Sequence, residues 1–258
     1  MRNILAVAGK ELRAYFHSAI GYVVLGIFAV VCGYFFYNYT GAFVVQTFRM
    51  MMSGQMAPNV SINEYIIRPM FEGVLSVVFV MLVIPMITMR LFAEEKRTGT
   101  MELLLTSPLT DLQIILGKFL GALGLYLCLM LMAFLYVGML FLYGNPSAKP
   151  LLAQALGFCL FGAALLAVGM WISALTKNQI IAFGVAAVLF LLLYVFDWAS
   201  SFNSSTWARV MSYMALPTHL ENFAKGVIDS SDAVYYLSVT FVGIFLTARS
   251  LEALKGKP

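Results

Sequence analysis

Charged residues are scarce in this sequence: Asp, Glu, Lys and Arg make up 11% of its 258 residues, while hydrophobic residues make up 62%. Soluble domains have about 25% charged residues. So few charges cannot cover the surface of a soluble protein, and lipid must be the main solvent. The residues outside the apolar stretches are also too few for an ordinary domain of about 100–150 residues. The composition excludes a soluble enzyme and predicts an integral membrane protein.

Cysteine and histidine are also rare. The three cysteines all lie in apolar runs, so a disulfide framework is excluded and we interpret them as small buried hydrophobic residues. The two histidines, His17 and His219, are expected on opposite sides of the membrane, with His219 forming a hydrogen bond in a loop. Four methionines between positions 50 and 56 have thioethers that can bind Cu(I). Flexible packing is favoured for them, no metal site is predicted, and the copper question stays open.

Six stretches are long and apolar enough to cross a bilayer as helices, which requires about 20 residues each. They are residues 20–37, 71–89, 119–141, 151–175, 180–196 and 234–248. We predict an all-α membrane protein with one transmembrane domain over residues 1–258. The middle of each span lacks ionisable residues, which argues against an ion-coupled transporter.

The distribution of Lys and Arg predicts the orientation. Eleven of the sixteen lie on the side that holds both termini and the second and fourth loops. By the positive-inside rule this side is cytoplasmic. We therefore expect a multi-pass protein of the plasma (inner) membrane with both termini in the cytoplasm. The basic charge reflects this topology, and no nucleic-acid partner is expected.

Residues 3–17 predict an amphipathic helix, because its apolar and polar side chains separate at 100° per residue. The apolar face consists of Ile4, Leu5, Ala8, Leu12, Tyr15 and Phe16. We interpret residues 1–19 as a helix in the membrane interface, with its apolar face toward the acyl chains and its basic face toward lipid headgroups. A frayed start of the first span is the alternative.

The second cytoplasmic loop, residues 90–113, predicts a short helix between two breaks. Gly99 breaks the chain, Thr100 is the expected N-cap, and Pro108 stops the helix. Thr110 and Gln113 then have the spacing of a capping box at the start of the third span.

The short helix has apolar side chains that would face the cytosol, on Met101 and residues 103–105. Two interpretations are open. The helix lies on the membrane surface, or it docks into a groove of a soluble partner.

The last outer loop, residues 198–233, predicts a helical hairpin between spans five and six. Residues 207–215 form one helix. Pro217 starts another, with a Thr218–Glu221 capping box, that runs to about residue 228. The hairpin would dip into the outer leaflet or cap a cavity, and we predict that it controls exit. Its proposed gate residues are Trp207, Pro217, Thr218, Glu221 and Phe223.

The loop sequence EEKRTGTMELLLTSP at residues 94–108 closely resembles the permease subunit of ABC-2 type transporters. Family members have an acidic pair, a basic residue, Gly, Thr, an acidic residue, a Leu run and Pro at this place. The chain looks most like the gliding-motility permeases, to whose last outer segment residues 217–236 are similar. Copper-enzyme maturation permeases are near relatives by the same loop.

The resemblance implies a dimer with a second permease copy or a paralogue, bound to two copies of a cytoplasmic ABC ATPase. It makes the loop helix the coupling helix. The residues it assigns to ATPase coupling are Glu94, Glu95, Gly99, Thr100, Met101, Glu102, Leu103, Leu104, Leu105 and Pro108.

The chain lacks the phosphate-binding motif G-x-x-x-x-G-K-[ST], since Gly117-Lys118 is followed by Phe119. We expect no cofactor in this chain, with ATP and Mg²⁺ bound by the partner ATPase. The expected function is therefore a non-enzymatic transport permease, acting in export and surrounded by membrane lipid. The alternative is a non-transporting anchor that couples the ATPase to an outer-side partner. The substrate, the type of dimer and any outer-side accessory protein stay open.

Overall fold

The computed structural model describes residues 2–17, 19–53, 61–106, 108–201 and 206–255, and these residues form helices without any strand. The α-helices are α1 Arg2–His17, α2 Ala19–Met52, α3 Ser76–Val78, α4 Ile84–Thr88, α5 Ala93–Thr98, α6 Met101–Leu105, α7 Asp111–Tyr143, α8 Ala148–Leu175, α9 Gln179–Ser201, α10 Thr206–Met214, α11 Leu216–Ala224 and α12 Ser230–Lys255. Three π-helical segments are η1 Asn63–Ile67, η2 Pro69–Leu75 and η3 Phe79–Val83.

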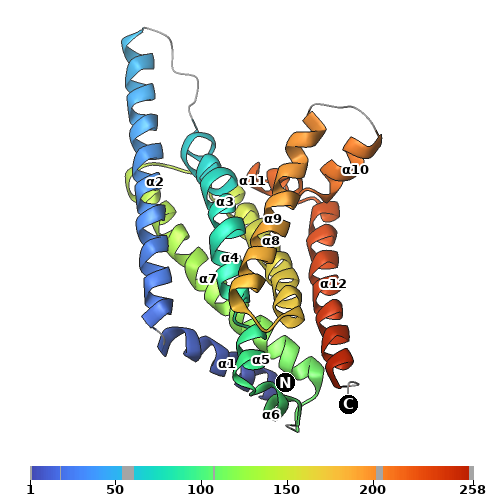
Figure 1. Ribbon diagram of the computed structural model, residues 1–258. Helices are drawn as coiled ribbons and strands as arrows, with labels where there is room; N and C mark the ends of the chain where they lie inside the picture. The colour runs from blue at the N-terminus through green and yellow to red at the C-terminus, as the bar shows by residue number, and fades with distance from the viewer. Residues whose placement is uncertain (1, 18, 54–60, 107, 202–205, 256–258) are drawn as a thin grey trace.

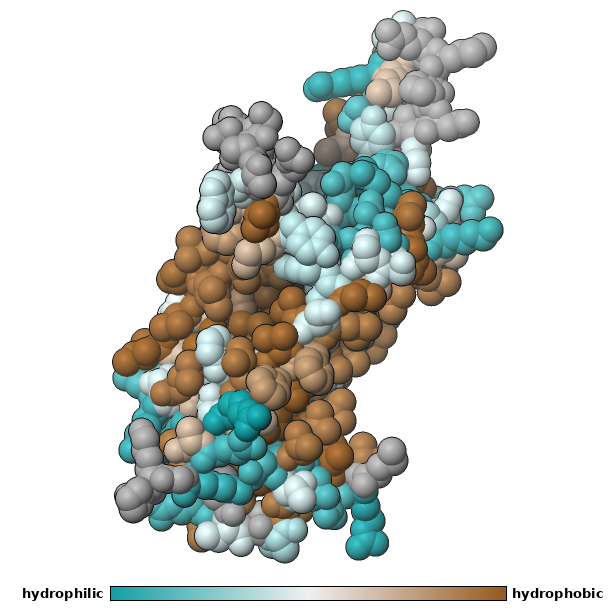
Figure 2. Space-filling model, turned by 90° about the vertical axis from the view of Figure 1, so that its right-hand side faces the viewer, coloured by the Kyte–Doolittle hydropathy of each residue, from teal (hydrophilic) through white to brown (hydrophobic). Residues whose placement is uncertain are grey.

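Six of the helical stretches in the described ranges are long and apolar enough to cross a membrane, which confirms the predicted fold class. Both termini lie at one end of the molecule together with α1, α5 and α6 (Figure 1). We call this the termini end, and the opposite end, which holds α10 and α11, the far end. Figure 2 shows apolar side chains gathered over the middle of one face, with hydrophilic side chains toward both ends.

The first span is much longer than predicted. It was expected over residues 20–37, but α2 has 34 residues and continues to Met52. The predicted bounds of this span place Met50, Met51 and Met52 in the loop after it, but all three belong to α2, while Met56 lies outside the described residues. The polar residues after position 37 did not end the helix, because a single Asn or Thr lowers helix stability only slightly relative to Ala.

The second span runs from Asn63 to Thr98 and contains the three π-helical segments. Pro85 lies in the first turn of α4, directly after η3. Proline has no N–H to donate, and a wider turn is one of the adjustments by which a spanning helix accommodates it. The π-helical segment η3 ends at Val83, two residues before Pro85.

Helix α8 forms the centre of the bundle, with more than half of its apolar window buried. It packs against α4, α9, α11 and α12. A Cβ atom on Gly243 of α12 would lie 2.7 Å from the backbone of Ala167, so these two small residues permit the close contact. Helices α2, α9 and α12 have few fully buried side chains and present apolar side chains outward, as expected of helices that face lipid or a second subunit.

Candidate functional site

The segment predicted to couple to an ATPase folds as two short helices joined at a glycine. Helix α5 ends at Gly99, whose φ of +74° is left-handed, a conformation that favours glycine. The predicted break is therefore confirmed. Thr100 precedes α6 as predicted, but its side chain does not cap the helix. The hydroxyl of Thr100 lies 2.9 Å from that of Thr98 instead.

The start of α7 matches its prediction. The Thr110 hydroxyl accepts from the N–H of Gln113 at 3.3 Å, and the Gln113 side-chain oxygen accepts from the N–H of Thr110 at 3.4 Å. This reciprocal pair is a capping box. Pro108 is exposed in the turn before it, three residues after α6 ends.

The predicted apolar face of α6 is split between two sides of the helix. Leu103 is 73% exposed and points outward, beside the exposed Glu102. Met101 is only 7% exposed and Leu104 packs against the core, so neither offers a free surface. The reason is helical geometry, since residues two apart point about 200° away from each other. The prediction that Met101 faces the partner is wrong, and the side chain of Leu105 lies outside the described part of the chain.

A buried lysine binds α1, α5 and α7 together. Lys118 of α7 is 2% exposed, and its ammonium lies 2.8 Å from a carboxylate oxygen of Glu11 and 2.8 Å from one of Glu95. The ammonium also lies 5.3 Å from the ring centre of Phe92, a cation–π contact. We call Lys118, Glu11 and Glu95 the lysine clamp. These ion pairs of Lys118 were not predicted from the sequence.

Helix α5 is also fixed to the end of α8. The Ser173 hydroxyl accepts from the N–H groups of Phe92 and Ala93, at 3.1 Å each. The Lys96 ammonium donates to the carbonyl of Ala174. In addition, Glu94 pairs with Arg90 at 2.8 Å. Glu94 and Glu95, which the resemblance assigns to ATPase coupling, thus each have a basic partner within their own chain.

Helix α1 lies across a glycine stripe of α7 at the termini end. A Cβ atom on Gly117 would lie 2.6 Å from Val7, and one on Gly121 would lie 3.1 Å from the carbonyl oxygen of Ala8. Burial raises the pKa of the Tyr15 phenol, and nearby Glu11 adds to the rise. The phenol thus stays protonated and donates to the carbonyl of Ile87 at 2.9 Å. The face expected to lie among acyl chains instead packs largely on protein.

Replacing Gly117 by leucine is expected to push α1 off α7. The new side chain would occupy the place of Val7, and such overpacking costs about 1–3 kcal/mol. Gly138→Leu on the same helix is the matched control, because a Cβ atom there meets nothing within 4 Å. Thermal unfolding of the detergent-solubilised protein measures both variants. Equal midpoints for the two would contradict the packing of α1 on the glycine stripe.

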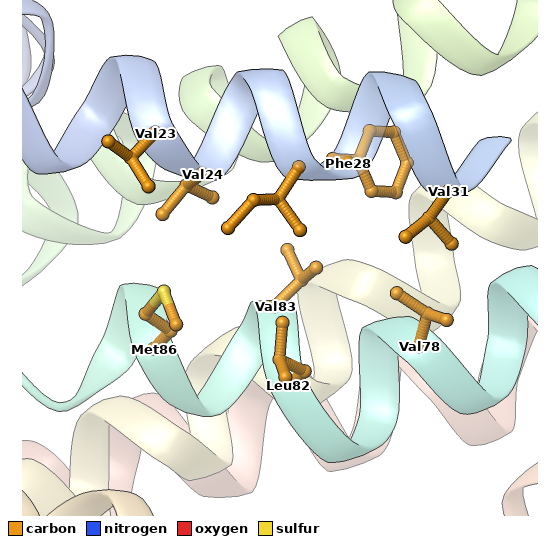
Figure 3. Close-up of a pocket in the computed structure, with 9 residues that line it drawn as sticks. Val23, Val24, Phe28, Val31, Val78, Leu82, Val83 and Met86 are labelled. Carbon is orange, nitrogen blue, oxygen red and sulfur yellow. The ribbon is translucent and has the colours of Figure 1, made fainter. Parts of the chain in front are cut away.

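An apolar groove separates α2 from the second span (Figure 3). Its volume is about 130 Å³. The lining residues are Val23, Val24, Ile27, Phe28, Val31, Val78, Leu82, Val83 and Met86. At Val24 and Met86 it adjoins a second cavity of about 190 Å³ that extends to Arg90 and Arg97. With no polar group in its wall, the groove can accept only hydrocarbon, from lipid or from an apolar helix.

The predicted outer hairpin is present as α10 and α11, with details that differ from the prediction. Helix α11 begins at Leu216, after the N-cap Ala215, so Thr218 and Glu221 form no capping box. Pro217 occupies the first turn, where a residue without an N–H fits well. The helix therefore begins at Leu216, before Thr218, which was the predicted N-cap. The helix ends at Ala224, before the left-handed Gly226 and short of the predicted residue 228.

The five predicted gate residues do not form one cluster. Trp207 is 76% exposed on α10, while Phe223 is fully buried in the bundle. Thr218 donates to the carbonyl of Ser212 at 3.2 Å. Glu221 binds Lys225 at 2.6 Å and lies 3.7 Å from Arg68.

The far end contains a polar cluster that sequence reasoning missed. His219 is buried in α11, not in a loop as expected, with Nδ1 2.7 Å from Asp232 and Nε2 2.9 Å from the carbonyl oxygen of Tyr213. The Tyr235 hydroxyl donates to the carbonyl of Met214, and the Tyr236 hydroxyl to that of Leu216. The outer clasp, as we call it, comprises Tyr213, His219, Asn222, Asp232, Tyr235 and Tyr236. It joins the turn between α10 and α11 to the start of α12.

Within the described ranges, no three His, Cys, Asp or Glu side chains lie close enough together to hold a metal ion. The geometry at the termini end therefore offers an exposed apolar side chain on a firmly anchored short helix, and the far end offers a buried polar clasp. The first feature suits contact with a partner protein, and the second suits the fixing of the outer helices α10 and α11 to α12.

A comparison with protein families agrees with this geometry. The family model described as ABC-2 family transporter protein matches residues 5–232, which is most of the chain. No curated protein sequence matches it. The chain therefore belongs to the ABC-2 transporter family, whose members are the membrane-spanning, non-enzymatic permease subunits of ABC transporters.

Proposed function

We propose that this permease exports a substrate using ATP hydrolysed by a separate cytoplasmic ATPase, present in two copies per complex. In this proposal the termini end faces the cytoplasm of the cell, and α6 is the helix that docks into the ATPase. The gliding-motility permeases are the subgroup we propose for it, on the likeness of residues 217–236.

One observation carries the proposal: α6 presents Leu103 to solvent from a rigid support. Leu103 is 73% exposed on a five-residue helix, and a partner that covered it would remove this apolar surface from water. The support is rigid because α5, directly before α6, is held by the lysine clamp and by Ser173. A push on α6 would therefore reach α1, α7 and α8 together.

A second copy of the permease is the proposed partner within the membrane. Helix α2 leaves an apolar groove beside the second span, and most of its own surface is exposed. A pathway for substrate would then lie between two subunits, because one bundle is filled by its own core. The exposed Trp207 and Tyr213 of α10 support an additional outer-side accessory protein.

Reconstitution into vesicles tests the proposal. The permease is purified with an ATPase co-expressed from its own gene neighbourhood, and ATP-dependent movement of labelled lipids and solutes is measured. We expect movement that requires both subunits and ATP. ATP hydrolysis with no movement of any substrate class would instead favour the non-transporting anchor, since docking through α6 would serve that function equally well. Movement without ATP would contradict the proposal that ATP hydrolysis drives transport.

A further inference from the structure

We propose that an anionic phospholipid from the leaflet at the termini end binds between α2 and the second span. One acyl chain lies in the apolar groove, and the phosphate is bound by Arg90 and Arg97. The proposal rests on the membrane-spanning helices and is independent of the proposed function.

The groove has the shape of a hydrocarbon chain. Side chains of α2 and of the second span point toward each other across it (Figure 3). Its wall on α2 runs from Val23 to Val31, about 12 Å along the helix axis. Over that length its volume is only about 130 Å³, whereas a helix with its side chains is about 10–12 Å across. A second subunit could therefore insert single side chains there, but an acyl chain can lie along the whole groove.

The groove is open toward the bilayer and closed toward the core. Ile27 and Leu82, which line it, are 54% and 43% exposed. On the inner side Phe28 is only 2% exposed, and its ring centre lies 5.2 Å from that of Phe79 in η3. A chain can thus enter sideways from the membrane, and it covers apolar surface that the protein itself leaves open.

The end of the groove nearest the termini leads to a basic cavity. This second cavity, of about 190 Å³, shares Val24 and Met86 with the groove and has Arg90 and Arg97 in its wall. Glu94 is the acidic residue in the same wall, and it pairs with Nε of Arg90 at 2.8 Å. Arg97 is exposed and forms no ion pair with any residue that the structure describes. The wall therefore has one positive charge in excess.

A lipid phosphate matches this excess charge. A guanidinium group donates two parallel N–H groups to phosphate oxygens, which a carboxylate-free arginine such as Arg97 can do with its full set of donors. Among the described residues Arg90 uses only Nε in a hydrogen bond, so its terminal nitrogens also face the cavity as donors. Charge complementarity thus favours a headgroup with a net negative charge over one that brings its own cation.

The polar end of the site is held in place by its surroundings. Tyr15 of α1 lines the cavity, and its phenol donates to the carbonyl of Ile87 at 2.9 Å. Helix α5, which carries Arg97, is anchored through Glu95 in the lysine clamp. A bound lipid would therefore contact α1, α2, α5 and the second span at once.

Native mass spectrometry of the purified permease measures the binding. Phosphatidylglycerol and phosphatidylcholine with identical acyl chains are added in equal amounts. We expect one phosphatidylglycerol per chain to be retained, with a preference of about fivefold or more, since one arginine beside an anionic lipid contributes about that factor. Equal retention of the two lipids would overturn the proposal.

Arg97→Gln tests the headgroup end. It should weaken the binding of phosphatidylglycerol by about fivefold and leave phosphatidylcholine unchanged. Arg249→Gln is the matched control, because Arg249 is an exposed arginine of the same end but lies on α12, away from α2 (Figure 1). Both side chains lie at the surface, so both variants should fold. Equal effects of the two substitutions would contradict a phosphate at Arg97.

Val24→Trp tests the acyl-chain end, because an indole at the junction with Met86 would fill the passage between groove and cavity. It should weaken both lipids alike. Val30→Trp on the same helix is its control, since Val30 is 71% exposed and does not line the groove. Thermal unfolding midpoints check that both variants are folded. Should Val24→Trp not fold, Arg97→Gln still decides the proposal.

The place of the lipid is mapped with phosphatidylglycerol that carries a photoreactive diazirine in one acyl chain. We expect crosslinks to residues 23–31 and 78–86, which unlabelled phosphatidylglycerol should suppress. Crosslinks confined to other surfaces would overturn the proposal, and so would a lipid-free dimer in which the second copy fills the groove. Failure of vesicle transport would count against the proposed function and leave these readouts valid.

Discussion

Leu103→Asp is expected to release the ATPase while leaving the permease folded. The side chain is 73% exposed, so its replacement changes little within the chain itself. In the proposed complex it would bury a carboxylate without a partner, in place of a leucine worth about 1.5–3 kcal/mol on burial. We expect the affinity for the ATPase to fall by about 10- to 100-fold or more. Co-purification and titration of the ATPase onto the permease in nanodiscs measure this.

Leu254→Asp is the matched control, because this leucine is also exposed but lies in the last turn of α12. It should bind the ATPase like the wild type. Leu104→Asp is a poorer test than Leu103→Asp, since Leu104 packs against the core and its loss would also disturb folding. Full ATPase binding and transport by Leu103→Asp would show that α6 lies on the membrane instead.

Lys118→Met is expected to lower the free energy of unfolding by about 3–5 kcal/mol, the cost of breaking a buried ion pair on one side. The ammonium is the shared partner of Glu11 and Glu95, both mostly buried. Oε2 of Glu95 already has no hydrogen-bond partner. Without the lysine, two carboxylates would face each other. Thermal unfolding in detergent measures the loss.

Two control variants test whether the buried ion pairs cause the loss of stability in Lys118→Met. Lys255→Met breaks an ion pair with Asp111 whose side chains are 42% and 23% exposed, and it should cost about 1 kcal/mol or less. The triple variant Lys118→Met, Glu11→Gln, Glu95→Gln removes all three charges and should recover much of the stability. Equal losses in Lys118→Met and Lys255→Met would contradict a buried clamp. The triple variant should still bind the ATPase yet link hydrolysis poorly to transport.

Local patterns in the sequence predicted the fold well. Apolar stretches of sufficient length gave the six spans, because a bilayer demands helices with internally satisfied backbones. The capping box at Thr110 and Gln113 and the break at Gly99 were also predictable, since each depends on residues within three positions of it. The capping box at Thr218 and Glu221 failed for a local reason too: Pro217 suits the first turn of a helix, and α11 starts ahead of it.

Contacts between distant residues could not be predicted in this way. Glu11 and Lys118 are 107 positions apart, and the residues next to each of them in the sequence do not indicate that the two side chains form an ion pair. The pair His219 and Asp232 spans 13 positions and requires the turn at Gly226 to bring α11 back to α12. Met101 was grouped with Leu103 although residues two apart lie on opposite sides of a helix, and which of these sides the bundle covers depends on distant contacts.

The length of α2 exposes part of the chain to chemistry from the aqueous phase. Its 34 residues extend about 51 Å. Even at a tilt of about 40° they would cover about 39 Å along the bilayer normal, against a hydrocarbon thickness of about 30 Å. Helix α2 ends at the far end (Figure 1), where Met51 and Met52 are 67% and 76% exposed. A water-borne oxidant would reach these thioethers before those of the packed core, and sulfoxides formed there would add polarity to a solvated helix end without disturbing the bundle.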